Sequence, residues 1–422
     1  MQQTISVDAV SEKDKAVLRR LAERLAEIAA LPVQRERAAM WRRLNDLDPV
    51  KPMVWINEIP WHEMDVNGEL QPETSHPWAR ELEIQLRRTI YQWEHIPGDM
   101  VIEPKIYSPL VIHDSGFGLQ EIADRVWVDA QGVASRRFHP QIRDERDLEK
   151  IKTPVVTHDV EASERIYQIM RDIFGDILEV EQQGVPGVWF APWDQLVRWW
   201  GVQEVLMDLI ERPALIHAAI DRLVNAHLSR LEQWEQLGLL SLNNKNIRVG
   251  SGGYGYTSEL PQAGFDPHRV RAIDLWGCAT AQIFVGVSPE MHEEFALRYE
   301  RRWLERFGLS YYGCCEPLHH KIHILRSIPN LRKISISPWA DVETAVQETN
   351  GDYVLSYKPS PAVLAADEWD PEFARRSLRE ALEKMRGCAV EVIMKDISTV
   401  RYEPQRLWEW AKIAAEETER VS

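Results

Sequence analysis

Residues 309–358 read LSYYGCCEPLHHKIHILRSIPNLRKISISPWADVETAVQETNGDYVLSYK, and this stretch decides the fold class. Short apolar runs at 309–314, 333–337 and 353–357 alternate with helical patterns at 318–328 and 341–349. A strand followed by a helix, repeated along the chain, is typical of parallel βαβ units. The stretch therefore predicts neighbouring strands of one parallel sheet.

The same alternation continues on both sides of this stretch. Residues 52–56 read as a buried strand, and 203–238 are helical, with Pro213 at the start of a second helix. The other segments with these patterns are apolar runs at 247–249, 281–287 and 389–394 and helical stretches at 289–307, 371–386 and 404–418.

We therefore expect an α/β protein in which residues 50–422 form a (β/α)8 TIM barrel. Such a barrel needs roughly 250 residues, and no Gly-Ser-rich hinge divides the chain. The competing architecture is a doubly wound open sheet. Its nucleotide-binding form is disfavoured, because the Gly-rich stretch 250–255 lacks the spacing and the following helix of a dinucleotide fingerprint.

Residues 1–49 are expected to form a helical N-terminal extension of the barrel. A second helical pattern at 35–44 follows the first and ends before Pro49. The first helix is indicated by apolar residues at three-to-four spacing, namely Val17, Leu18, Leu21, Leu25 and Ile28.

Composition and charge exclude several classes of protein. The 422 residues are 44% hydrophobic and 27% charged, which excludes a disordered chain and a disulfide-stapled mini-protein. The net charge of −16 disfavours nucleic acid as a partner, because an acidic surface repels phosphate. The N-terminus has neither a basic start nor an apolar stretch, and no run approaches the roughly 20 apolar residues that span a bilayer. We expect a cytoplasmic protein that does not bind membranes.

Polar or reactive groups follow each of four predicted strands. The catalytic groups of a barrel gather at the C-terminal ends of its strands, so four such ends in succession predict a lined pocket. These ends are CCEPLHH (314–320), SPW (337–339), KP (358–359) and KDIST (395–399).

The first of these ends is the strongest candidate site. Because side chains alternate along a strand, Cys314 and Glu316 are expected to face one way and Cys315 the other. A cysteine and a carboxylate two residues apart can reach one zinc ion, so Cys314 and Glu316 are the first-choice ligands, with Cys315 and Asp396 as the next candidates. Asp396 could equally pair with Lys395, and a cysteine at a strand end is often a small buried hydrophobe.

The remaining candidates have weaker signals. His320 is a candidate acid toward a leaving oxygen, and Lys358 is either a pocket residue or a solvated surface lysine. Cys278 and Cys388 are isolated in the sequence and are expected in the core. Rigid aromatic walls suit a flat ligand, although most tryptophans serve core packing. The residues expected to contact substrate are Tyr312, Trp193, Trp339 and His113, the last either at a strand end or in a turn.

Three strand-end segments resemble those of the uroporphyrinogen decarboxylase superfamily. They are YYGCCEPLH (311–319), ISISPWAD (334–341) and KDISTV (395–400). The likeness extends from about residue 50 onward and is strongest over 275–415. It implies a (β/α)8 barrel and an activity found in that superfamily, which contains decarboxylases and zinc-dependent methyltransferases that work with corrinoid proteins.

The sequence departs from both branches at defined positions. WINEI (55–59) stands where the decarboxylases carry an arginine motif, and Asp396 replaces a histidine. The methyltransferases bind zinc through His-x-Cys after one strand and Cys after the last. Here Tyr312 and Asp396 stand at two of those positions, so only Cys314 matches directly.

The CCEPLH and KDIST segments are most similar to the first methyltransferases of anaerobic O-demethylase systems. That resemblance implies transfer of a methyl group from an aryl methyl ether to the cobalt of a separate corrinoid protein. Zinc, or a nearby acid, would activate the ether oxygen. The alternatives are a decarboxylase of a tetrapyrrole or aromatic carboxylate, which needs no metal, and a non-catalytic corrinoid or tetrapyrrole carrier. The carrier is disfavoured because the chain lacks the Asp-x-His-x-x-Gly signature of many cobalamin-binding proteins.

Overall fold

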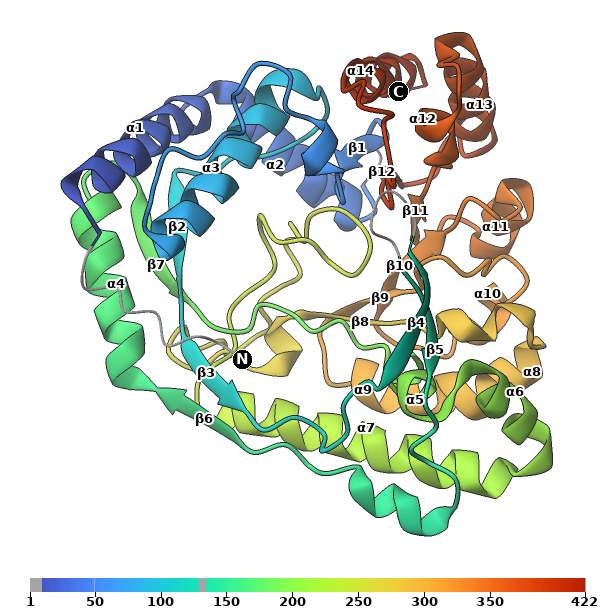
Figure 1. Ribbon diagram of the computed structural model, residues 1–422. Helices are drawn as coiled ribbons and strands as arrows, with labels where there is room; N and C mark the ends of the chain where they lie inside the picture. The colour runs from blue at the N-terminus through green and yellow to red at the C-terminus, as the bar shows by residue number, and fades with distance from the viewer. Residues whose placement is uncertain (1–9, 49, 129–133, 422) are drawn as a thin grey trace.

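The computed structural model describes residues 10–48, 50–128 and 134–421. Its main sheet is parallel throughout, and its strands lie in the order β1-β12-β11-β10-β9-β8 (Figure 1). The parallel α/β architecture is thereby confirmed, and the three runs of 309–358 form adjacent strands. The strands are β1 (Met53–Ile56), β8 (Trp276–Ala279), β9 (Leu309–Tyr312), β10 (Leu331–Ile336), β11 (Val354–Tyr357) and β12 (Val390–Met394).

The hydrogen-bonded sheet of the described residues is open, with β1 and β8 at its edges. Between these edges the described chain forms separate two-stranded sheets and three isolated bridges, of which one, from Val185 to Leu240, is parallel. Gly184, Pro186 and Gly187 surround that bridge, and both residue types weaken strand pairing. Closure into an eight-stranded barrel therefore stays a prediction. The pairs are β2 (Lys105–Pro109) with β7 (Glu179–Gln183), β3 (Val111–Asp114) with β6 (Val156–Asp159), and β4 (Ala123–Val128) with β5 (Ala134–Phe138).

Helices cover the outside of the main sheet, with α9 to α14 beside the strands they connect (Figure 1). None of the helices in the described ranges is long and apolar enough to cross a membrane. The helices are α1 (Glu12–Ala29), α2 (Pro32–Asn45), α3 (Pro77–His95), α4 (Val160–Phe174), α5 (Pro192–Trp200), α6 (Val202–Glu211), α7 (Pro213–Gln236), α8 (Pro289–His292), α9 (Arg298–Leu304), α10 (Ile322–Leu325), α11 (Val342–Thr349), α12 (Ala362–Ala365), α13 (Pro371–Lys384) and α14 (Gln405–Arg420).

Three expected elements differ in the structure. Residues 247–249 form no strand, and only an isolated bridge joins Arg248 to Tyr254. The run 281–287 forms the 3-10 helix Gln282–Gly286, and the strand lies earlier, at 276–279. Small residues let that strand pack closely, since a side chain at Gly277 would lie 2.5 Å from the Phe307 ring. The expected helix 318–328 is reduced to the single turn Ile322–Leu325.

The N-terminal helices pack against the rest of the molecule. Helix α1 shares a core with α3 and α4, while Trp41 of α2 is fully buried and donates from Nε1 to the Asp99 carbonyl at 2.8 Å. Two helices, over 12–29 and 32–45, form where the sequence predicted two helical segments, and the division into an extension and a barrel stays a prediction. Residues 1–9 and 49 of the predicted 1–49 segment lie outside the described residues, and the boundary near residue 50 stays a prediction.

The Gly-rich stretch packs closely against buried side chains of β12 and α2. The segment between α7 and β8, yellow in Figure 1, passes through the middle of the view. A side chain at Gly252 would lie 2.2 Å from Glu391 Oε1, and one at Gly253 would lie 2.5 Å from the Trp41 ring. These glycines are therefore required by close packing against buried side chains.

Replacing Gly253 with alanine should destabilise the protein. The rigid Trp41 ring cannot yield to the added methyl group, so we expect Gly253→Ala to lower the free energy of unfolding by about 1–3 kcal/mol. Urea denaturation measures this. Gly286→Ala is the control, because nothing lies within 4 Å of its added carbon. Equal stability of the two variants would contradict the packing argument.

Candidate functional site

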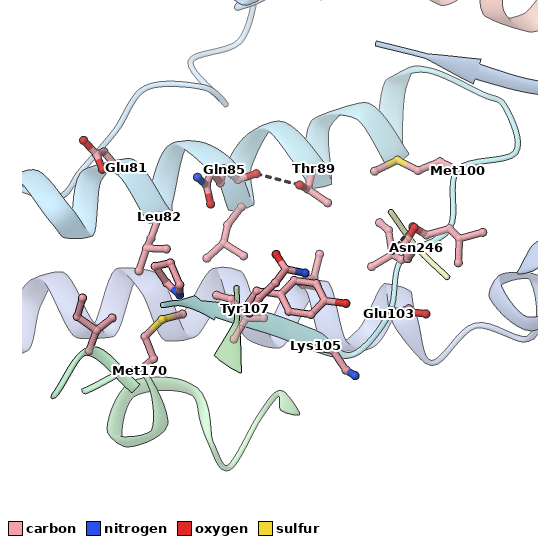
Figure 2. A pocket seen from close by; sticks show the side chains of 18 of the residues that line it. Glu81, Leu82, Gln85, Thr89, Met100, Glu103, Lys105, Tyr107, Met170 and Asn246 are labelled. Atoms are coloured by element: carbon pink, nitrogen blue, oxygen red, sulfur yellow. Dashed lines mark hydrogen bonds between the residues drawn. The ribbon is translucent and has the colours of Figure 1, made fainter. Parts of the chain in front are cut away.

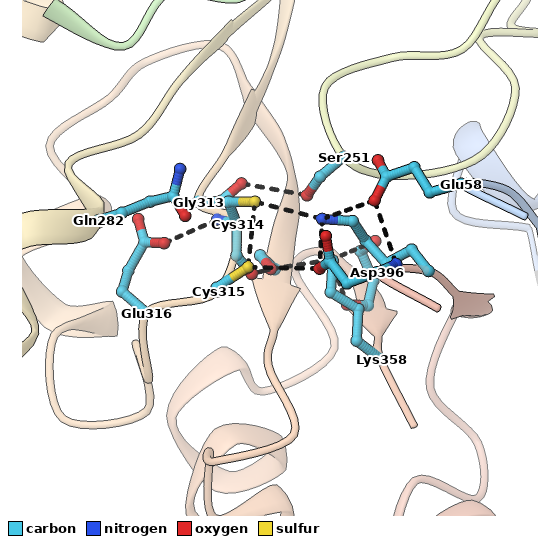
Figure 3. Close-up of polar contacts among 12 residues, drawn as sticks. Glu58, Ser251, Gln282, Gly313, Cys314, Cys315, Glu316, Lys358 and Asp396 are labelled. Atoms are coloured by element: carbon cyan, nitrogen blue, oxygen red, sulfur yellow. Dashed lines mark hydrogen bonds and ion pairs between the residues drawn. The ribbon is translucent and has the colours of Figure 1, made fainter. Parts of the chain in front are cut away.

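The two adjacent cysteines bring their thiols together at the end of β9. The strand ends at Tyr312, and Gly313 adopts a φ of 97°, which interrupts the alternation of side chains. As a result, Cys314 Sγ and Cys315 Sγ lie 3.5 Å apart (Figure 3). The expectation that they face opposite ways was wrong, because the pleat ends before Cys314.

Glu316 points away from these sulfurs. It is buried, and its carboxylate accepts hydrogen bonds from the Cys314 backbone N–H at 2.9 Å and from Thr280 Oγ1 at 2.7 Å. The carboxylate therefore fixes the turn after β9. The expectation that Glu316 shares a metal with Cys314 is not supported by this orientation (Figure 3).

The end of β12 meets the thiols, as its sequence predicted. Asp396 Oδ2 lies 3.6 Å from Cys315 Sγ, and Lys395 Nζ lies 3.5 Å from Cys314 Sγ. Lys395 and Asp396 also form an ion pair at 2.8 Å. The predicted pairing of Asp396 with Lys395 is therefore confirmed, and its role as a metal ligand stays a prediction.

Glu58, which sequence reasoning missed, links this cluster to Arg248. Its Oε2 accepts from the Asp396 backbone N–H at 3.1 Å, and its Oε1 accepts from both terminal nitrogens of Arg248 at 3.1 Å. Glu58 lies two residues beyond β1, the neighbour of β12 in the sheet. No local motif marks it, since its role depends on that strand pairing.

The cluster favours a thiolate at Cys314. A hydrogen bond with the Cys315 thiol lowers the pKa of Cys314 to about 7, against the effect of burial, and the Lys395 ammonium adds to this lowering. The same pairing raises the pKa of Cys315. Burial alone would lower the pKa of Lys395, but the Cys314 sulfur and the Asp396 carboxylate raise it. One sulfur anion is thus stabilised near neutral pH.

Lys358 lies beneath the thiols rather than on the surface. Its buried Nζ donates to Tyr311 Oη and Ser335 Oγ, each at 2.8 Å. Burial lowers the pKa of Lys358 to about 8. Ser335 in turn donates to the Cys314 carbonyl. Lys358 therefore supports the cysteine turn from below and has no direct contact with either sulfur among the hydrogen bonds of the described residues.

Three residues expected to contact substrate lie elsewhere. Tyr312 faces the outer helices, where its hydroxyl donates to Glu300 Oε2 at 2.6 Å. Trp193 is fully buried and packs edge-on against Phe284 with a 4.8 Å centroid separation. His113 lies on β3 in a separate antiparallel pair. These three predictions were wrong for the same reason: tertiary packing decides in which direction a side chain points.

His320 and Trp339 are at the expected strand ends but are exposed. Trp339 is 77% exposed after β10, and the His320 ring lies 3.8 Å from that of His319. Within the described residues, no hydrogen bond joins His320 to the thiol cluster. Its expected role as an acid therefore has no geometric support. Cys278 is buried, as expected, and Cys388 is half-buried.

The donor set at the thiols fits zinc in part. Two sulfurs, each about 2.3 Å from a tetrahedral ion, lie about 3.8 Å apart, close to the observed 3.5 Å. The Asp396 carboxylate beside Cys315 is a chemically suitable third ligand. Of the four candidate ligands, Glu316 thus turns away, while Cys314, Cys315 and Asp396 lie together.

A tighter group of metal-ligand types occurs elsewhere. Among the described residues, only Glu69, Glu94 and His95 bring three such atoms within 4.8 Å of one another. His95 Nε2 lies 2.6 Å from Glu69, and Arg24 pairs with Glu94 at 2.8 Å. At this site, which is separate from the thiols, Glu69 is already paired with His95 and Glu94 with Arg24.

Two cavities differ in their relation to this cluster. A cavity of about 210 Å³ at the β8 edge is lined in part by Trp189, Trp276, Arg248 and Cys278. Arg248 joins it to the thiols through Glu58. The larger cavity, about 590 Å³, lies between α3 and β2 and includes none of the predicted site residues (Figure 2). The smaller cavity is therefore the one associated with the strand-end chemistry.

Asp194 is a further carboxyl group that sequence reasoning missed. Burial, reinforced by the charge of Glu316, raises its pKa to about 6 from an ordinary 3.8. Gln282 Nε2 donates to its carboxylate at 3.2 Å. Asp194 therefore holds a proton more tightly in the folded protein than in the unfolded chain.

We expect Asp194→Asn to stabilise the protein in a pH-dependent way. The stability from the raised pKa is present below about pH 3.8 and is lost as the pH rises through 6. The variant should match wild type near pH 4 and exceed its free energy of unfolding by up to roughly 3 kcal/mol near pH 7.5. Urea denaturation at both pH values tests this. A difference that does not change with pH would contradict it.

The fold and the site define an α/β protein with a polar, thiol-containing cluster at the C-terminal ends of parallel strands. No family model matches the chain, and no curated protein matches it. Among solved structures, it is similar to a methyltransferase from Methanosarcina mazei, with a TM-score of 0.48 and 12% sequence identity. The alignment covers 91% of this chain and 98% of that one. A likeness at this level assigns neither a family nor an activity.

Proposed function

We propose that the protein is a methyltransferase that moves a methyl group from a methoxylated aromatic donor to the cobalt of a separate corrinoid protein. The observation that carries the proposal is the adjacent thiol pair, with the pKa of Cys314 lowered to about 7, beside Asp396. Aryl ethers are unreactive because the phenolate leaves poorly. The reaction therefore needs an electrophile, such as a metal ion, at the ether oxygen. The cluster supplies thiolate and carboxylate groups that could bind such an ion.

Cys314, Cys315 and Asp396 would hold a zinc ion. When bound, zinc supplies a Lewis acid that withdraws electron density from the ether oxygen. In the reaction the methyl carbon–oxygen bond breaks, the methyl group joins the reduced cobalt of the partner, and the leaving oxygen takes up one proton. The same three side chains would orient the reacting ether oxygen and methyl group at the C-terminal ends of the strands.

Two further features are consistent with this role. The 210 Å³ cavity beside Trp189 and Trp276 suits a single aromatic ring. The Asp396 side chain is 53% exposed and Cys315 is only half-buried, so a cofactor carried by another protein could approach the cluster from solvent. A site enclosed on all sides would exclude that partner.

The proposal is tested with free cobalamin as the acceptor. We would incubate the purified, zinc-loaded protein with reduced cobalamin and a panel of methoxylated arenes, and follow methylcobalamin by absorbance and the phenol by chromatography. Equal amounts of both products, with about one zinc per chain by metal analysis, would support the proposal. Release of carbon dioxide from carboxylated arenes without methylcobalamin would identify the decarboxylase instead. Tight cobalamin binding without either product would identify a carrier.

A further inference from the structure

The loop that follows β12 has an unusual backbone and a buried anchor. Asp396, Arg401 and Tyr402 have φ values of 55°, 60° and 57°, in the left-handed region that is unfavourable for a non-glycine residue. Such conformations persist only where the surroundings determine them. The loop must therefore be held by contacts outside its own sequence.

Glu63 supplies these contacts. Its side chain has no exposed surface, and its carboxylate accepts from Thr399 Oγ1 at 2.8 and 2.9 Å. It also accepts from the backbone N–H groups of Val400 at 2.7 Å and Tyr402 at 3.3 Å. Burial alone would raise the pKa of Glu63, but these hydrogen bonds lower it, so the carboxylate is ionised. One buried anion thus gathers three donor groups of the loop.

Strand pairing brings the anchor to the loop. Glu58 and Glu63 both follow β1, and the Ile56–Met394 pair aligns the end of β1 with the end of β12. Glu58 binds the Asp396 backbone N–H at the start of the loop, and Glu63 binds its far half. The loop is therefore fixed at both ends by the segment after β1, with Asp396 directed toward Cys315.

We propose that Glu63 is a positioning residue that fixes the loop 396–402 so that Asp396 stays beside the Cys315 thiol. The inference rests on the proposed function for its effect on rate, but its structural content is independent of the reaction. Glu63 itself touches neither sulfur. Its effect passes through the loop backbone, in the way that residues supporting a ligand side chain tune a site.

Glu63→Gln tests this, because the amide keeps the size of the side chain but turns one acceptor into a donor facing other donors. We expect kcat for methyl transfer to fall about 10–100-fold with KM for the donor within about twofold. Amide hydrogen exchange at Val400 and Tyr402 should accelerate at least about tenfold, and iodoacetamide should alkylate Cys315 faster. A change of less than twofold in all three measurements would overturn the proposal.

Glu83→Gln is the matched control. Glu83 is also buried without exposed side-chain surface and accepts from the backbone N–H groups of Glu73 and Thr74, each at 2.8 Å, but lies near the start of α3. It should change neither kcat nor exchange at Val400. Equal loss of kcat in both variants would show that Glu63 contributes only to stability, and would overturn the proposal.

A second variant tests the same proposal if Glu63→Gln does not fold. Thr399→Val removes the hydroxyl that donates to Glu63 with little change in shape, and it should reproduce a smaller part of the same effects. If wild type transfers no methyl group, the exchange and alkylation measurements still decide the positioning role. Faster exchange with no activity in any variant would refute the proposed function while supporting the role of Glu63.

Discussion

Cys314→Ala should abolish methyl transfer while leaving the fold intact. The Cys314 sulfur contacts both the Cys315 thiol and the Lys395 ammonium, and it is the sulfur most readily ionised. Replacing residues that merely support a metal ligand costs about 10–100-fold, so loss of the proposed ligand itself should cost more than about 100-fold in kcat. Zinc content should fall in parallel. The measurements are methylcobalamin formation and metal analysis of the purified variant.

Cys388→Ala provides the matched control for this experiment. Cys388 is half-buried and lies before β12, far from the ends of the strands that carry the thiols. It should retain wild-type activity and zinc content. An active, zinc-containing Cys314→Ala protein would refute the proposed mechanism. Loss of activity in both variants would mean that replacing any cysteine inactivates the protein, and the result for Cys314→Ala would then not support a specific role for that thiol.

Glu391→Gln should destabilise the protein more than any other single change considered. Glu391 Oε2 and Lys333 Nζ lie 2.8 Å apart, and neither side chain has exposed surface. The ammonium also lies 5.4 Å from the Trp276 ring centroid and donates to the Tyr254 carbonyl at 3.2 Å. Removing the negative charge leaves Lys333 buried without a counter-charge, which costs about 3–5 kcal/mol. Urea denaturation, followed by tryptophan fluorescence, measures this loss.

The double variant Lys333→Met, Glu391→Leu separates loss of the ion pair from loss of packing. Because both charges are removed together, no unpaired charge remains, and its free energy of unfolding should lie much closer to wild type than that of Glu391→Gln. A double variant less stable than Glu391→Gln would mean that shape at this position matters more than charge. A loss below about 1 kcal/mol for Glu391→Gln would contradict the argument.

Patterns confined to a short stretch of sequence predicted the elements well. The runs in 309–358 became β9, β10 and β11 in adjacent positions, and Pro213 separates α6 from α7 as expected. The strand at 276–279 was missed because three of its four residues, Gly277, Cys278 and Ala279, are small rather than markedly apolar. The meeting of the cysteine pair with Asp396, which lies 3.6 Å from Cys315 Sγ, also followed from parallel strands ending at one edge.

Local sequence patterns did not predict the directions in which side chains of the site point. Cys315 turns toward Cys314 because of the conformation of Gly313, which a strand-based alternation cannot include. Tyr312 lies on an expected strand and Trp193 on the unexpected helix α5, and both side chains are fully buried by packing partners from other elements. Their placement depends on packing partners far away in the sequence.

The sequence by itself determined the parallel α/β class and the strand ends at which reactive side chains gather. These properties follow from periodicity, which acts between residues a few positions apart. Only the tertiary structure decided which thiol meets which charge, that Glu316 turns away, and that Glu58 and Glu63 hold the loop after β12. The physical reason is that these contacts depend on how the chain turns and pairs in three dimensions. The contacts of Glu58 and Glu63 join segments more than 300 residues apart and are created by the pairing of β1 with β12, while Cys315 and Asp396 are 81 residues apart.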